Sequence, residues 1–362
     1  FGALWVQRNR YPAGNRDWLS KFAHLVNRVL DLGRRHLSIG GMETYKTLLL
    51  EWSILLLVVL YVFAGDLQYY TYQSDSGAYD MWYEAYLRDA EGPADSTMDD
   101  YLANARALAD PNDGQLQSAL DQLEARVQEL RQRAEEGGYE PWLLQQEPYR
   151  NLYGDWPQEV QRRNATLAMI VVALCSVGLV AYERQAGVVY MLRSVKRGRR
   201  GIFRRKTVLA VLLAVAVSAI LYGHEILRFL EEYQPNVLAA PVQNLDFLRD
   251  FPLKISISGY MALTYGLRTC MLILTAFVAM FIGSRANRME GAYMLVLGIL
   301  GVPALLLILG LDVFGWVSPA ILISTSQLLN LTASQPLAIL PWILWAAAGG
   351  LAWFFSRKYW VR

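Results

Sequence analysis

The chain has 362 residues, of which 54% are hydrophobic and only 18% are charged. This composition excludes a disordered or nucleic-acid-coating protein and indicates a membrane protein. The formal net charge of +2 averages two opposite populations: residues 65–164 hold 20 acidic and 8 basic residues, and the rest of the chain holds 12 acidic and 26 basic residues. A bilayer between the two populations is the simplest explanation of this contrast.

Six apolar runs are long enough to cross a hydrocarbon core, which needs about 20 residues. In chain order they cover residues 47–64, 165–182, 207–223, 259–283, 291–311 and 335–355. The third run is the shortest and could extend past Tyr222, and Gly298, Gly301 and Pro303 favour a kink in the fifth. The sequence therefore predicts an all-α polytopic membrane protein with six transmembrane helices.

Basic residues in short loops orient the spans, because such loops stay on the cytoplasmic side. If both termini are cytoplasmic, the inner segments carry 22 basic and 5 acidic residues, and the outer segments carry 11 basic and 26 acidic residues. The inner segments are 1–46, 183–206, 284–290 and 356–362, and the outer segments are 65–164, 224–258 and 312–334. This distribution predicts cytoplasmic termini and an extracytoplasmic domain at 65–164.

The extracytoplasmic domain is predicted to contain an antiparallel helical hairpin. A turn cluster at Asp110–Gly114 separates two apolar stripes with helical spacing. Asp113 is the expected N-cap of the second helix, and Gly137-Gly138 is its expected stop. The stripes consist of Met98, Tyr101, Leu102, Ala105 and Leu108, and of Leu116, Leu120, Leu123, Val127 and Leu130. The tyrosine-rich flank at 69–86 favours packing and a membrane-interface belt, with a binding face as the alternative.

The inner segment 1–46 contains an amphipathic helix directly ahead of the first span. Basic residues lie away from its apolar stripe, as is typical of a helix that lies in the membrane interface. A calmodulin-type target is the less favoured interpretation. The stripe consists of Trp18, Phe22, Leu25, Val29 and Leu32.

The loop between the second and third spans carries a pattern that a positive-inside anchor does not explain. A Glu is followed by a Gly four residues later, a Leu, a Gly-Arg pair and a Lys at the next span. This order resembles the cytoplasmic loop of ABC type 2 permeases, the membrane subunits of ATP-driven exporters. The matching residues are Glu183, Gly187, Leu192, Gly198, Arg199 and Lys206.

Other features extend the resemblance over most of the chain outside the hairpin domain. The family has an amphipathic connecting helix, six spans and a coupling helix between spans two and three, and residues 238–245 resemble the outer segment of some members. The resemblance implies a bacterial-type plasma membrane, a second permease half and a separate ATPase that binds ATP and Mg. Because the spans carry almost no charge, an apolar or amphiphilic cargo is expected.

In this resemblance the loop 183–206 docks on the ATPase. An apolar face of Val188, Val189, Leu192 and Val195 is expected to insert into a cleft of the partner, and Gly198 is expected to end the loop helix. Glu183 would pair with a cation of the partner or with Arg184 or Arg199.

The chain itself shows no catalytic or metal-binding motif. His24, His36 and His224 do not cluster, and Cys175 and Cys270 lie in apolar runs. Residues 37–41 resemble the start of an ABC signature, but a phosphate-binding loop needs a Gly-Lys pair, which the sequence lacks. We therefore expect no enzyme activity, no catalytic residue and no metal in this chain.

Two charged residues lie inside predicted spans, where a charge indicates a functional site by default. Glu51 is near the inner end of the first span, from which it can reach the interface. Arg268 is nine residues into the fourth span, about 14 Å deep. A structural pair for Arg268 is at least as well supported as a transport role, and Asp246, Asp250 and Glu225 are the candidate partners.

Three questions stay open at this level. A rival function is a membrane sensor or scaffold that transports nothing and whose outer domain is mechanically coupled to a cassette ATPase. A membrane-embedded enzyme is a third, weaker reading. The start at Phe1–Arg10 and the end at Leu351–Lys358 both resemble a span that exits into a basic tail, so the chain is either half of a fused permease or separate.

Overall fold

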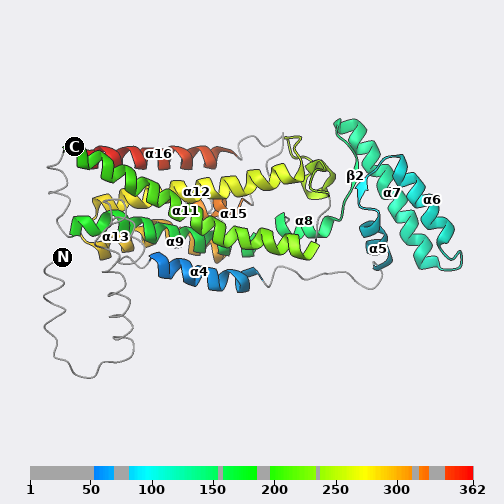
Figure 1. Ribbon diagram of the computed structural model, residues 1–362, viewed down its shortest axis with the longest axis horizontal. Coiled ribbons are helices and arrows are strands. Elements are labelled where there is room, and N and C mark those ends of the chain that lie inside the picture. Colours follow the sequence, from blue (N-terminus) through cyan, green and yellow to red (C-terminus); the bar gives the residue numbers. More distant parts are fainter. Residues whose placement is uncertain are drawn as a thin grey trace, which may run out of the picture.

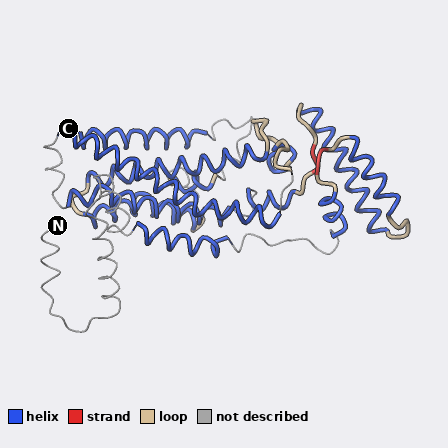
Figure 2. The backbone as a smooth tube through the Cα atoms, viewed as in Figure 1, coloured by secondary structure: helices blue, strands red, loops and turns tan. Residues whose placement is uncertain are grey.

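The computed structural model describes residues 53–68, 81–153, 158–185, 196–233, 237–311, 318–325 and 339–361. These residues form a long helical bundle with a smaller helical domain at one end (Figures 1 and 2). We call this end the hairpin end and the opposite end, where the last helix finishes, the far end. The bundle helices are α4 (Ser53–Gln68), α9 (Gln158–Gln185), α11 (Lys196–Tyr233), α12 (Ile257–Arg285), α13 (Met289–Val296), α14 (Val302–Ile308), α15 (Pro319–Ser324) and α16 (Leu340–Val361).

Four helical stretches of the described chain are long and apolar enough to cross a membrane. They are Glu159–Gln185, Arg200–Glu231, Ile257–Arg285 and Met289–Ile308, and they overlap the second to fifth predicted spans. α4 and α16 overlap the first and sixth predicted spans. The fold is therefore consistent with an all-α membrane protein.

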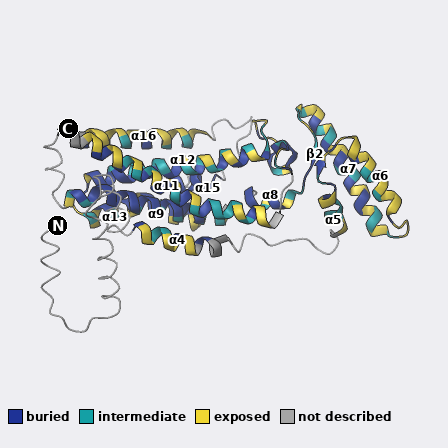
Figure 3. Ribbon diagram, viewed as in Figure 1, coloured by how far each residue is buried: buried dark blue, intermediate teal, exposed yellow. Residues whose placement is uncertain are grey.

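α9 is the central helix of the bundle. It packs against α11, α12, α13 and α15, and 72% of its most apolar window is buried, compared with 39% in α11. Figure 3 shows the buried residues concentrated along α9 and the facing sides of its neighbours. Its small and medium apolar side chains allow this close packing, and Ala165, Ala168, Met169, Val172 and Val177 are fully buried.

Two features of the bundle differ from the expected spans. α11 has 38 residues and runs from Lys196 to Tyr233, well beyond the expected 207–223 at both ends. Gly198 lies inside α11, so the prediction that this glycine ends a helix is wrong. Residues 196–200 are all helical, so the backbone at Gly198 does not make the left-handed turn with which a glycine commonly ends a helix.

The fifth predicted span is interrupted as its glycines and proline suggested. A π-helical turn, η5 (Leu297–Gly301), separates α13 from α14. Pro303 follows this turn in α14 and has no N–H to donate to the preceding helical turn, which is consistent with an irregular helix at this point.

The smaller domain contains α5 (Met81–Asp89), α6 (Ser96–Leu108) and α7 (Gly114–Gly137), and the next helix, α8 (Gln146–Tyr153), packs against α11 and α12 at the end of the bundle. α7 begins and ends where the sequence predicts. The carboxylate of Asp113 accepts hydrogen bonds from the backbone of Gln115 and Leu116, and Gly138 has a φ of 63°. Leu120, Leu123, Val127 and Leu130 are buried, whereas Leu108, which belongs to the first helix as expected, is 88% exposed. It occupies the last position of α6, beside the turn.

One small β-element departs from the all-α prediction. β1 (Gly92–Pro93) pairs antiparallel with β2 (Trp142–Leu143). This ladder ties the chain that enters α6 to the chain that leaves α7, and Leu143 is buried in the hairpin core with Leu123, Val127 and Leu130. The base of the hairpin is thereby fixed.

Candidate functional site

A buried ion pair joins α9 to α11 near the far end of the bundle. The ammonium Nζ of Lys206 lies 3.1 Å from Oε1 of Glu183, and both side chains are only 1% exposed. Lys206 also donates a hydrogen bond to the backbone carbonyl of Leu179, and its Nζ lies 5.9 Å from the ring centre of Trp360 in α16. The two residues that flank the loop predicted to dock an ATPase are therefore in direct contact.

This pairing gives Glu183 a partner that the sequence analysis did not name. The sequence suggested Arg184 or Arg199, or a cation of another subunit, and in the structure Glu183 binds Lys206. Arg184 points elsewhere: it donates to the carbonyl of Ser284 and, at 2.9 Å, to the side chain of Asn287. These bonds join α9 to the end of α12.

The remaining predicted site residues are placed only in part. Arg199 lies in α11, but its side chain is outside the description. Glu51, Gly187 and Leu192 lie outside the described residues, as do the amphipathic helix of segment 1–46 and the apolar face of the loop.

A second buried ion pair lies toward the hairpin end. Nη1 of Arg268 in α12 is 3.0 Å from Oε2 of Glu225 in α11, and the Arg268 side chain is 1% exposed. Glu225 was one of the three candidate partners, and the prediction that Arg268 is paired inside the bundle is confirmed. The other two candidates, Asp246 and Asp250, do not pair with Arg268 among the described contacts, and Asp246 binds arginines of the hairpin instead.

The other N–H groups of the Arg268 guanidinium donate hydrogen bonds to the C-terminal end of α15. Nε donates to the hydroxyl of Thr325 at 3.1 Å, and Nη2 donates to the carbonyl of Ser324 at 3.3 Å. Thr325 ends α15 with a φ of 58°, a left-handed conformation that non-glycine residues seldom adopt. Carbonyls at a helix C-terminus carry partial negative charge, so this end of α15 suits a cation.

Two tyrosines complete the surroundings of Arg268. The guanidinium carbon lies 4.8 Å from the ring centre of Tyr222 and 5.0 Å from that of Tyr265. These distances are within the range of cation–π attraction, which strengthens away from water. Arg268 therefore joins α11, α12 and α15 into one polar cluster inside an apolar bundle.

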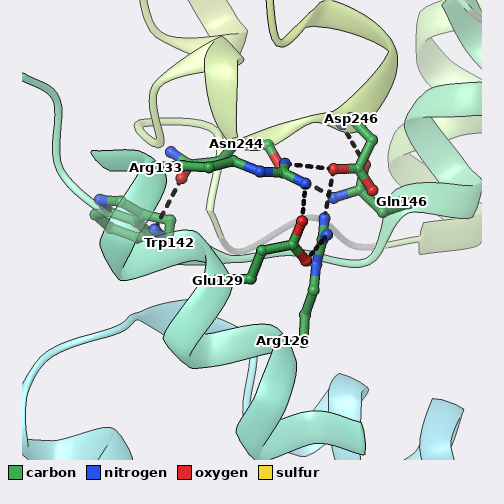
Figure 4. Close-up of polar contacts among 7 residues, drawn as sticks. All are labelled: Arg126, Glu129, Arg133, Trp142, Gln146, Asn244 and Asp246. Atoms are coloured by element: carbon green, nitrogen blue, oxygen red, sulfur yellow. Dashed lines mark hydrogen bonds and ion pairs between the residues drawn. The ribbon is translucent and has the colours of Figure 1, made fainter. Parts of the chain in front are cut away.

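A third polar cluster joins the hairpin to the bundle, and Figure 4 shows its members. Asp246 lies in the segment 237–256, which connects α11 to α12 and which we call the connecting segment. Its Oδ1 accepts hydrogen bonds from Arg126 at 2.6 Å and from Arg133 at 2.7 Å, both from α7. Glu129 of α7 binds the same two arginines, at 2.9 Å from Nη1 of Arg126.

Asn244 forms the neighbouring half of this cluster. Its side-chain oxygen accepts from the backbone N–H of Trp142 at 3.1 Å, and its amide donates to the carbonyl of Glu140 at 3.1 Å. Gln146 bonds both to the carbonyl of Asn244 and to the backbone N–H of Asp246, each at 3.0 Å. We call the whole contact set, from Arg126 to Asp246, the hairpin joint.

The arginines of the hairpin joint stabilise the ionised forms of its two carboxylates, Asp246 and Glu129. Partial burial alone would raise the pKa of Asp246, but the hydrogen bonds and charges of Arg126 and Arg133 outweigh it and hold this pKa below its ordinary value. The pKa of Glu129 is likewise lowered, since the same arginines outweigh its desolvation. Sequence reasoning noted the segment 238–245 but missed this joint, because its partners are about 100 residues apart.

The hairpin also has an open groove of about 310 Å³ between α6 and α7. Leu102, Leu120 and Val127 line it, and Arg106 pairs with Glu124 at 3.1 Å along its rim. Among the described residues, no group of three or more His, Cys, Asp or Glu side chains could hold a metal ion.

Comparison of the chain with known protein families, curated proteins and solved structures gave no match.

Proposed function

We propose that the chain is the permease subunit of an ABC exporter. In this proposal six spans cross a bacterial-type plasma membrane, both ends of the chain are cytoplasmic, and residues 65–164 lie outside. A separate ATPase, which binds ATP and Mg, docks on the loop 183–206. A second permease half, identical or different, completes the pathway, and the cargo is an apolar or amphiphilic lipid, peptide or drug.

The observation that carries the proposal is the Glu183–Lys206 pair. The loop that resembles the ATPase-docking loop of ABC type 2 permeases starts and ends at this contact, 3.1 Å long and fully buried. Breaking a buried ion pair costs about 3–5 kcal/mol, so a force applied to the loop reaches α9 and α11 together. This is what a coupling element between an ATPase and a helical bundle requires.

The charge pattern of α11 supports its placement across the membrane. Lys206 and Glu225 belong to the two buried ion pairs, and the 18 residues between them include no Asp, Glu, Lys or Arg. At 1.5 Å per residue this stretch is about 27 Å long, close to the thickness of a hydrocarbon core of about 30 Å. Lys206 then lies near one boundary of the bilayer and Glu225 near the other, where a charge is least costly.

The mechanism follows from this arrangement by analogy with the resembled family. ATP binding closes the partner ATPases, the loop 183–206 moves with them, and the far ends of α9 and α11 follow. Arg184 adds α12 to the moving group through its hydrogen bond to the carbonyl of Ser284. Alternating access between the two membrane faces results when the second half moves in the opposite direction.

Photo-cross-linking tests the docking directly. A photoreactive amino acid at Leu192 of the full-length chain, expressed with its native partners, should capture an ATPase subunit. The matched control carries the same amino acid at Gln122 of α7 and should capture none. Capture only through the 284–290 loop or the C-terminal tail would refute the assignment of the 183–206 loop.

A membrane sensor or scaffold is the second candidate, and the hairpin joint favours it. An outer domain fixed this firmly to α12 is suited to pass a mechanical signal. Liposomes that contain the chain and its ATPase separate the two: an exporter moves a fluorescent amphiphile when ATP is added, whereas a sensor hydrolyses ATP without moving it.

A further inference from the structure

The hairpin domain is attached to the bundle through the connecting segment. The carboxylate of Asp246 forms ion pairs with Arg126 and Arg133, whose side chains are only 16% and 14% exposed. Lys254 adds a bond to the carbonyl of Gly138, the residue that ends α7. A displacement of α7 therefore displaces the connecting segment.

Backbone hydrogen bonds fasten the connecting segment to the start of α12. Val242 donates to Ile255, Ile257 donates to Ala240, and Ser258 donates to Leu238, each at 2.9 Å. The hydroxyl of Ser256 caps α12 by accepting from the N–H of Gly259. These bonds leave little freedom between the segment and the helix.

A chain of packed aromatic rings leads on from this point toward Arg268. Tyr153 of α8 contacts Tyr260 of α12 edge-on, with ring centres 5.2 Å apart, and lies 6.4 Å from Tyr265. Tyr265 lies 6.0 Å from Tyr222 of α11, and both rings face the Arg268 guanidinium. Rigid rings packed in sequence transmit displacement, because a dense interior has no voids to absorb it.

We propose that the hairpin domain and the Arg268–Glu225 pair are energetically coupled through the hairpin joint, α12 and these rings. A ligand or partner that moves α7 would then change how firmly α11 and α12 are held together, although it never touches either helix. The inference rests on the proposed function only for the extracytoplasmic location of the hairpin.

Hydrogen–deuterium exchange of the full-length chain in lipid nanodiscs tests the coupling. Asp246→Ala should accelerate exchange about fivefold or more in the α11 peptide that contains Glu225, in addition to the expected loosening of α7. Coupling is reciprocal, so Glu225→Gln should accelerate exchange in α7 around Arg126 and Arg133.

Asp121→Ala is the matched control. Like Asp246, Asp121 is an aspartate paired with an arginine of the hairpin domain, Arg106, but it lies outside the hairpin joint. The Asp121→Ala change should leave the exchange rate of the peptide that contains Glu225 unchanged. If Asp246→Ala folds poorly, Asp246→Asn provides the same comparison at lower cost.

Two results would overturn the inference. One is faster exchange in Asp246→Ala confined to α7 and the connecting segment. The other is an equal acceleration at the far end around Glu183, which would indicate global destabilisation. The experiment uses no ATPase, so its failure would leave the docking of an ATPase on the 183–206 loop untouched.

Discussion

Arg268 shows how one charged side chain is accommodated inside an apolar bundle. An isolated arginine at the centre of a membrane helix costs about 2.5–3.5 kcal/mol on insertion scales. Here Glu225 neutralises the charge, and Ser324 and Thr325 accept further hydrogen bonds. The cluster links three helices, so its loss should affect stability before any effect on transport.

Arg268→Leu should lower the free energy of unfolding by about 3–5 kcal/mol, because it leaves Glu225 buried without a cation. Arg268→Lys should be partly tolerated, since it keeps the charge but loses the planar fork. Thermal unfolding in nanodiscs measures both. Arg249→Leu, an exposed arginine of the connecting segment, is the control, and an unchanged melting temperature for Arg268→Leu would contradict the cluster.

A corresponding loss of stability is expected when Lys206 is replaced at the far end. Lys206→Met should destabilise the chain strongly, and the double change with Glu183→Gln should recover much of the loss, because the buried carboxylate is then also removed. Arg205→Met changes the exposed neighbour and should have little effect. Additive losses in the double variant, measured in the same unfolding assay, would argue against a paired contact.

At the scale of helices, α9 and α12 approach closely at one glycine. A Cβ at Gly283 would lie 3.0 Å from the carbonyl oxygen of Val177, which is backbone and cannot rotate away. This contact lies near the far end, where the proposed coupling acts. Close approach there allows α9 and α12 to move as one body.

Gly283→Ala should therefore cost about 1–3 kcal/mol by forcing the two helices apart. Gly266→Ala in the same helix is the matched control, because a Cβ there meets nothing within 4 Å. That change should be neutral or stabilising, since alanine favours a helix by roughly 1 kcal/mol over glycine. Equal melting temperatures for the two variants would rule out the close contact.

Among helix ends, those marked by local capping residues were predicted correctly from the sequence. Asp113 and Gly138 delimit α7 because capping depends on residues within one turn. The ends of α11 could not be predicted from hydropathy, because the apolar run is bounded by charged residues. The helix itself includes the charged stretch Lys196–Lys206. Lys206 can lie there only because Glu183 of another helix neutralises it, a tertiary contact that no local pattern reveals.

At the scale of the whole molecule, the hairpin joint connects the hairpin domain to the bundle. The sequence marked residues 238–245 by resemblance and Asp246 as a candidate partner of Arg268. It could not show that Asp246 binds Arg126 and Arg133, because three acidic residues of the outer segments were equivalent candidates. Only the fold brings α7 beside the connecting segment.

The hairpin joint should weaken in acid. The pKa of Asp246 is lowered in the folded state, so its contribution is complete above its ordinary pKa of about 4 and is lost as the pH falls through the folded value. Because the Asp246 side chain is 49% exposed, the effect should be modest. The protection of α7 amides, measured relative to their intrinsic exchange rate at each pH, should decrease as the pH falls below the ordinary aspartate pKa of about 4.

Asp246→Asn should remove the part of this acid response that Asp246 contributes, while Glu129 still titrates beside the same arginines. The amides of α7 should already be less protected at pH 7 in this variant. Asp121→Asn, whose ion pair lies outside the joint, should keep the wild-type profile. A profile for Asp246→Asn that matches the wild type would show that other groups control the joint.

The central claim is that the chain works as the membrane subunit of an ATP-driven exporter. Affinity purification of the full-length protein from its native membrane, followed by quantitative mass spectrometry of the bound subunits, tests this claim most directly. The account predicts a cassette ATPase in stoichiometric amount, which is lost when Leu192→Asp disrupts the 183–206 loop. Recovery of the chain without any ATPase, under conditions that keep other membrane complexes intact, would contradict it.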